Sequence, residues 1–147
     1  ISAVVGKKSV MKVAEKEVFI SSTFFPNSLA YVAALKTIAF MKKNKVIEDI
    51  NKRGGEFLAN LTKIVAKSGV NAEVSGYPSM QFITFPKDKE NTYKAKRTEF
   101  YTQTIRRGLF IQPFHHGYIA YRHTDADLRK SEQIVAEALE IVKYKEF

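Results

Sequence analysis

The sequence contains no cysteine, which excludes disulfide bonds and thiolate metal sites and fits a reducing compartment. It also lacks a run of about 18 uninterrupted apolar residues, the length needed to cross a bilayer. The N-terminus shows no charged segment followed by an apolar one, the pattern of a secretory signal. We therefore predict a cytoplasmic protein that does not bind membranes.

Acidic residues are in the minority: 24 Lys and Arg stand against 15 Asp and Glu, a formal net charge of +9. Such a charge is compatible with nucleic acid, an anionic surface or a solvated basic exterior. Basic residues are spread along every predicted helix, and their densest groups lack the regularly spaced aromatic residues that stack on bases. We expect no nucleic-acid partner. A non-catalytic basic interaction domain that binds nucleic acid or a partner protein remains the alternative function.

Several catalytic patterns are missing as well: a Ser/His/Asp order, a glycine-rich phosphate loop and paired carboxylates. His115 and His116 are adjacent in a segment expected to be extended, where neighbouring side chains point to opposite faces, so we predict no metal site. His123 precedes a helix-capping pattern and is predicted to be a structural hydrogen-bonding residue. Arg122 either binds a substrate carboxylate or is an ordinary exposed arginine at a strand end.

With 147 residues and 45% hydrophobic content, the chain can bury a core. Residues 7–13, 28–44, 46–68, 92–107 and 125–142 have the periodicity of helices, the second of them long and well buried. Gly54 and Gly55 lie inside the third helix and predict a close helix contact or a kink. Strands are predicted at residues 1–6, 72–77, 80–85, 109–112 and 117–121. This order predicts an α+β fold with a small, mostly antiparallel sheet covered by helices on one face.

The segment SSTFFPNSLA, residues 21–30, places three hydroxyl residues directly before the long predicted helix. Hydroxyl and amide donors at such a position can bind a phosphate. The same residues can instead form a turn with capping hydroxyls, which is the simpler interpretation from the residues alone. Asn27 or Ser28 is the expected N-cap of the helix.

Three segments resemble motifs of the class III aminotransferases, which are pyridoxal-phosphate (PLP) enzymes of fold type I. Residues 22–30, STFFPNSLA, resemble the family's G-T-x-x-x-N-P-L-A stretch. Residues 107–113, RGLFIQP, resemble R-G-x-x-x-x-P, and residues 123–128, HTDADL, resemble H-T-x-x-D-[IL]. The most similar subfamily is that of the glutamate-1-semialdehyde 2,1-aminomutases.

The resemblance implies the C-terminal domain of a fold type I PLP-dependent transferase. Residues 1–27 would be the end of the large PLP domain, containing a strand and the cofactor-phosphate loop. Residues 28–147 would be the small C-terminal α/β domain, beginning with a long interdomain helix. Thr23, with Ser22 at the family's glycine position, would bind the phosphate of pyridoxal 5'-phosphate held by the other subunit of a homodimer.

The implied activity is transfer of an amino group between a small amino compound and a keto or aldehyde compound. In the family, the lysine that attaches the cofactor lies in the part of the chain that would precede Ile1. We therefore expect no catalytic residue among these residues. The chain is expected to be a C-terminal fragment that lacks the cofactor and is inactive alone.

Overall fold

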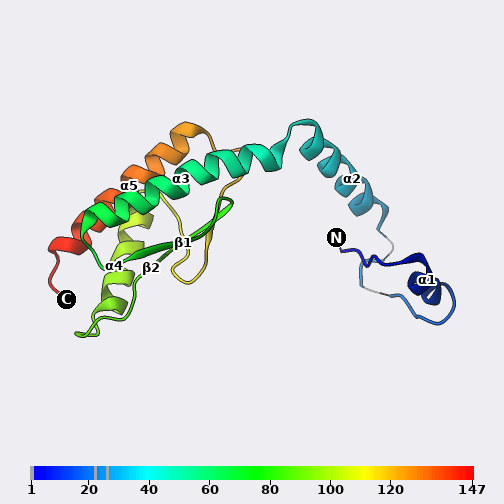
Figure 1. The fold of residues 1–147 in the computed structure, drawn as a ribbon, viewed down its shortest axis with the longest axis horizontal. Coiled ribbons are helices and arrows are strands. Elements are labelled where there is room, and N and C mark those ends of the chain that lie inside the picture. The colour runs from blue at the N-terminus through cyan, green and yellow to red at the C-terminus, as the bar shows by residue number, and fades with distance from the viewer. Residues whose placement is uncertain (1, 22, 26) are drawn as a thin grey trace. The chain divides into compact units, whose positions relative to one another are not determined.

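The computed structural model describes residues 2–21, 23–25 and 27–147. The chain divides into two compact units, Ile1–Lys45 and Val46–Phe147, which we call the N-terminal and C-terminal units (Figure 1). The domain boundary expected after residue 27 remains a prediction. Within the described ranges, no helix combines the length and apolar character needed to span a bilayer.

The N-terminal unit contains helix α1 (Lys8–Met11), the 3-10 turn η1 (Lys12–Glu15) and helix α2 (Ser28–Lys43). Asn27 caps α2, because its Oδ1 accepts a hydrogen bond from the amide of Ala30 at 3.1 Å. Both helices and the Asn27 cap confirm the prediction. The strand predicted at residues 1–6 is wrong for residues 2–6, which are exposed and form no strand, and Ile1 lies outside the described residues. A strand needs a neighbouring strand for its backbone groups, and the described part of this unit contains none.

Helix α2 is not the well-buried helix that its apolar content predicts. No described residue of α2 is buried, and Leu29 and Leu35 are 81% and 69% exposed. Its apolar residues are distributed around the helix, so no single face collects them. A helix that is apolar on all sides is typical of the interior of a larger protein.

The C-terminal unit confirms the predicted α+β fold. It contains helices α3 (Val46–Ser68), α4 (Tyr93–Arg106) and α5 (Asp125–Tyr144) and strands β1 (Glu73–Tyr77), β2 (Met80–Thr84) and β3 (Gly117–Tyr118). The strands form one antiparallel sheet in the order β1-β2-β3. Glu73 lies opposite Thr84, and Met80 lies opposite Tyr118.

The segment between α4 and β3 departs from the prediction. Residues 109–112 form no strand, although half-buried and exposed side chains alternate there. Gly108 has a φ of +89°, and the Leu109 amide donates to the Thr104 carbonyl at 2.9 Å. This turn at the end of α4 sets the direction in which residues 109–112 leave the helix. Among the described residues, the sheet does not include this segment. Strand β3 is likewise shorter than predicted, because a turn begins at Ala120.

The core of the C-terminal unit lies between the helices and one face of the sheet. Helix α3 packs against β1 and α5, and α4 packs against α5 (Figure 1). The Tyr101 hydroxyl donates to the Ile83 carbonyl at 2.8 Å and so ties α4 to β2. Burial raises the pKa of Tyr101 to about 12, which keeps the phenol a donor. The largest fully buried side chains are those of Phe100, Tyr101, Thr104, Val135 and Leu139.

Gly54 lies where α3 closely approaches the β1–β2 turn. A Cβ at Gly54 would lie 2.0 Å from the carbonyl oxygen of Pro78, whereas a Cβ at Gly55 would meet nothing within 4 Å. The close contact predicted from the glycine pair is therefore confirmed at Gly54, with a turn rather than another helix as its partner.

Asp88 organises the start of α4. Its carboxylate accepts hydrogen bonds from the Thr92 hydroxyl at 2.6 Å, the Thr92 amide at 2.7 Å and the Tyr93 amide at 3.2 Å. Lys96 adds an ion pair at 3.0 Å. The Thr92 hydroxyl above all, then Lys96 and the amides, hold the pKa of Asp88 well below its ordinary value of 3.8, against the opposing effect of burial.

We expect Asp88→Asn to reduce the sensitivity of the fold to acid. A carboxyl group whose pKa is lowered on folding stabilises the protein above its unfolded pKa, and this stabilisation is lost as the pH falls through the folded value. Urea unfolding followed by far-UV circular dichroism at about pH 7 and about pH 3 should show a smaller loss on acidification than in the wild type. Asp125→Asn, an exposed carboxylate in α5, is the control. An unchanged acid response in Asp88→Asn would contradict the prediction.

Candidate functional site

Thr23, in the segment that precedes α2, is accessible. Thr23 lies in a turn and is exposed, and no hydrogen bond to its hydroxyl is formed within the described ranges. Ser22 lies outside the described residues. Because Asn27 caps the helix, Thr23 is not needed as a cap. Within the described ranges its hydroxyl is therefore available as a donor, four residues before the N-cap of α2.

Arg122 sits on a tight turn formed by residues 120–123, which we call the Arg122 turn. The His123 amide bonds to the Ala120 carbonyl at 3.0 Å, and the Ala120 amide bonds back to Nδ1 of His123 at 3.1 Å. Because Nδ1 accepts, the neutral His123 ring carries its proton on Nε2. The hydrogen bonding predicted for His123 is confirmed. The Arg122 side chain is exposed and, among the described residues, enters no hydrogen bond or ion pair.

Arg53 of α3 forms hydrogen bonds to the backbone of the Arg122 turn. Its Nη1 donates to the His123 carbonyl and its Nη2 to the Tyr121 carbonyl at 3.2 Å. Asp49, one helical turn earlier, accepts from Nε at 2.9 Å and from Nη2 at 2.6 Å. No sequence motif singled out Arg53. The (i, i+4) spacing from Asp49 signals an ion pair, but nothing local indicates the distant turn.

A capping box follows the turn directly. The Thr124 amide donates to Asp127 Oδ2 at 2.8 Å, and the Asp127 amide donates to the Thr124 hydroxyl at 3.2 Å. The Thr124 amide above all, and then the Thr124 hydroxyl, which donates to Asp127 Oδ2 at 2.7 Å, lower the pKa of Asp127. The predicted capping box is confirmed. The Arg122 turn is therefore fixed by its own hydrogen bonds, by Arg53 and by the start of α5.

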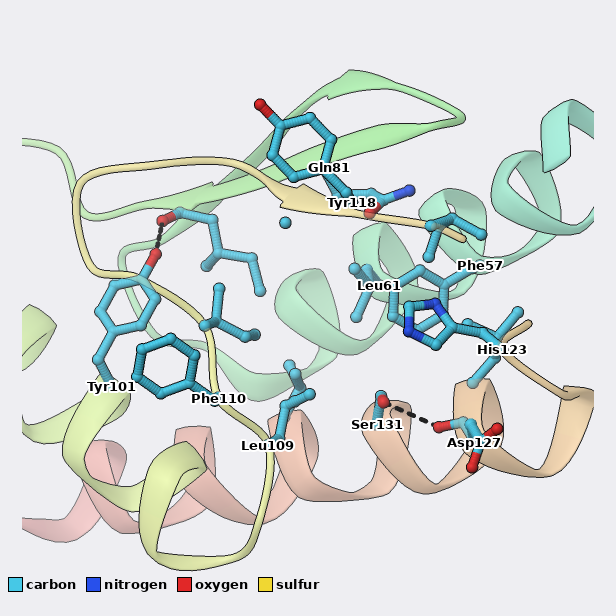
Figure 2. Close-up of a pocket in the computed structure, with 16 residues that line it drawn as sticks. Phe57, Leu61, Gln81, Tyr101, Leu109, Phe110, Tyr118, His123, Asp127 and Ser131 are labelled. Carbon is cyan, nitrogen blue, oxygen red and sulfur yellow. Dashed lines mark hydrogen bonds between the residues drawn. The ribbon is translucent and has the colours of Figure 1, made fainter. Parts of the chain in front are cut away.

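A small pocket of about 170 Å³ lies beside this turn, between the sheet, α5 and residues 109–111 (Figure 2). His123, Asp127 and Ser131 stand on one side of it. The Ser131 hydroxyl donates to the Asp127 carbonyl at 2.8 Å, and no buried polar side-chain atom in the described residues lacks a partner. Most of the remaining lining is apolar. The pocket therefore offers mainly apolar contact.

The two adjacent histidines differ from the prediction. Residues 115–116 are not part of a strand, and the rings of His115 and His116 lie side by side with centroids 4.5 Å apart. The expectation that they point to opposite faces is wrong, because the chain bends there. Within the described ranges, no group of three or more His, Cys, Asp or Glu side chains could hold a metal ion. Arg97 lies 4.4 Å from the centre of the nearby Phe114 ring.

Residues 1–143 match the family model for aminotransferases of class III. The chain belongs to the class III aminotransferase family, as the sequence motifs indicate. It is 48% identical over 143 residues to 3-aminobutyryl-CoA aminotransferase of Cloacimonas acidaminovorans, an alignment covering 97% of this chain and 34% of that protein. It is 27% identical over 144 residues to glutamate-1-semialdehyde 2,1-aminomutase of Archaeoglobus fulgidus, covering 91% of this chain and 34% of that protein.

Among solved structures, the FumI protein of Sphingopyxis sp. MTA144 in its PLP internal aldimine form matches with a TM-score of 0.81. The match has 17% sequence identity and covers 94% of this chain and 32% of that one. The fold is therefore that of part of a fold type I PLP transaminase, as expected. The chain spans about one third of the length of the curated relatives it matches.

Proposed function

We propose that the chain is the C-terminal part of a PLP-dependent aminotransferase that moves an amino group between an amino compound and a carbonyl compound. The observation that carries this proposal is the family match over residues 1–143, together with relatives of which the chain spans about one third. The lysine that attaches the cofactor would belong to the remainder of the protein. The 147 residues alone would then be inactive and bind no cofactor.

The residues present fit one part of PLP, its phosphate. Thr23 offers an exposed hydroxyl that forms no hydrogen bond within the described ranges, and such a donor suits a phosphate oxygen. When bound, PLP supplies the electron sink for amino-group transfer. In our proposal Thr23, with Ser22, binds the phosphate of the cofactor in the other subunit of a homodimer. The exposed apolar residues of α2 support a location inside a larger assembly.

For the substrate, the relative at 48% identity favours a 3-aminoacyl-CoA over the amino acid of the aminomutases at 27%. The two substrates differ in their anionic groups. The carboxyl group of the acyl chain is a thioester in 3-aminobutyryl-CoA, so its negative charge resides on the phosphates of CoA. Glutamate-1-semialdehyde carries a free carboxylate. Arg122, exposed on its turn, would bind a phosphate in the first case and a carboxylate in the second.

The net charge of +9 supports one alternative, a basic domain that binds nucleic acid or a partner protein without catalysis. This alternative requires an affinity for DNA or RNA that falls steeply with salt. A fluorescence anisotropy titration at two salt concentrations distinguishes it: weak binding without a steep salt dependence excludes a nucleic-acid partner.

The proposed reaction is tested with the full-length protein, PLP and a keto-acid acceptor. We expect transfer of the amino group from 3-aminobutyryl-CoA, detected as the amino acid formed from the acceptor, and much slower turnover of glutamate-1-semialdehyde. The isolated chain should show no turnover. Activity in the isolated chain, or none in the full-length protein with either substrate, would refute the proposal.

The role of Thr23 is tested by its removal in the full-length protein. Thr23→Ala should weaken PLP binding by about tenfold or more, because a hydrogen bond to a charged group contributes roughly 1.5–3 kcal/mol. Thr23→Ser keeps the hydroxyl and is the matched control. The dissociation constant is measured by titrating the apoprotein with PLP and following its visible absorbance. Equal affinities for the alanine and serine variants would exclude Thr23 as a phosphate ligand.

A further inference from the structure

The Arg53 side chain makes four hydrogen bonds although it lies near the surface. Its side chain is only 16% exposed. Nε and Nη2 donate to Asp49, and Nη1 and Nη2 donate to the carbonyls of His123 and Tyr121. With each of its three nitrogens engaged and its charge paired with Asp49, Arg53 is poorly placed to bind a further anion itself.

These contacts converge on the residues that flank Arg122. The two carbonyls bound by Arg53 belong to the neighbours of Arg122 on either side, Tyr121 and His123. The turn is also closed by reciprocal bonds between Ala120 and His123. The backbone at Arg122 is therefore held in place while its side chain remains exposed.

We infer that Arg53 is a positioning residue for Arg122: through the carbonyls of Tyr121 and His123 it fixes the turn from which Arg122 reaches an anionic group of the substrate. The inference rests on the proposed function. A preorganised cation binds more tightly because the turn does not have to be ordered on binding. A planar guanidinium can bridge two carbonyls and a carboxylate at once, whereas a lysine at position 53 can supply only a compact ammonium group.

The test is a double-mutant cycle in the full-length protein, with kcat and KM measured separately for 3-aminobutyryl-CoA and glutamate-1-semialdehyde. Arg122→Gln should raise KM by about tenfold and leave kcat nearly unchanged. Arg53→Gln should raise KM by about threefold to tenfold, and Arg53→Lys should not restore it. In the Arg122→Gln background, Arg53→Gln should have little further effect on KM, because its influence passes through Arg122. The substrate whose KM changes shows whether a phosphate or a carboxylate is bound.

Arg107→Gln is the matched control, since Arg107 also bonds a carbonyl, that of Gln103 at 3.2 Å, and a carboxylate, that of Glu137 at 3.2 Å, but lies outside the Arg122 turn. It should lower thermal stability without changing KM. Asp49→Asn weakens the orientation of Arg53 at a site 37% exposed and replaces Arg53→Gln should that variant not fold.

The possible results distinguish a failure of the proposed function from a failure of the inference about Arg53. Wild-type protein without amino-transfer activity refutes the proposed function. An active wild type whose KM is unaffected by Arg122→Gln, or in which the effects of Arg53→Gln and Arg122→Gln simply add, refutes the inference and leaves the proposed function standing.

Discussion

Replacing Phe100 by alanine should destabilise the protein by about 3–5 kcal/mol, the range for deleting a fully buried phenylalanine side chain. Phe100 is 0% exposed. Its ring lies 5.4 Å from that of Phe85 and 5.1 Å from that of Tyr101, centre to centre. Truncation therefore leaves a cavity where α4 meets the end of the hairpin. Urea unfolding of the chain, followed by far-UV circular dichroism because the sequence contains no tryptophan, measures the loss.

Phe110→Ala removes the same atoms from a side chain that is 80% exposed. It should change the free energy of unfolding by no more than about 0.5 kcal/mol, as is usual for surface positions. Because both variants lose the same atoms, the difference between their free energies of unfolding measures the effect of burial. Similar losses for both variants would show that Phe100 is not at the centre of the core.

Gly54→Ala should cost about 3 kcal/mol, the upper end for an overpacked site. The added Cβ would stand 2.0 Å from the carbonyl oxygen of Pro78 and 2.7 Å from its carbonyl carbon. Both partners are backbone, so relief requires α3 to move away from the β1–β2 turn. Since Arg53 directly precedes Gly54, this movement should also loosen the Arg122 turn. Thermal unfolding of the chain measures the cost.

Gly55→Ala is the control, and its expected sign is opposite. A Cβ at Gly55 meets nothing within 4 Å, and alanine is favoured over glycine in a helix by about 1 kcal/mol. The variant should therefore be as stable as the wild type or more stable. If Gly54→Ala were also stabilising, α3 would not approach Pro78 as closely as the structure indicates.

Much of the C-terminal unit could be predicted because its signals are local. The apolar periodicity of α3 and α5, the capping pattern at Thr124 and Asp127 and the glycine after α4 each act within a few residues. The predicted ends of α3, α4 and α5 lie within two residues of the observed ends; α3 spans residues 46–68 and α5 spans residues 125–144. The hairpin is likewise predicted by two apolar segments around a short turn.

The failures of prediction have a common cause. An extended apolar segment becomes a strand only when it pairs with another strand, and in the described residues neither residues 2–6 nor residues 109–112 take part in the sheet. The burial of α2 was predicted from its apolar content, but burial requires a partner surface. In each case the sequence pattern indicates which conformation or burial is possible for a segment, and the neighbouring parts of the protein decide whether it occurs.

The candidate site shows the same division. The amino-acid sequence by itself determined the family, through motifs around Thr23, Arg107 and His123, and the helices, through periodicity and capping. Only the tertiary structure joined Arg53 and Asp49 of α3 to the carbonyls beside Arg122. Hydrogen bonds between distant residues depend on how the helices pack, and no local pattern encodes that packing.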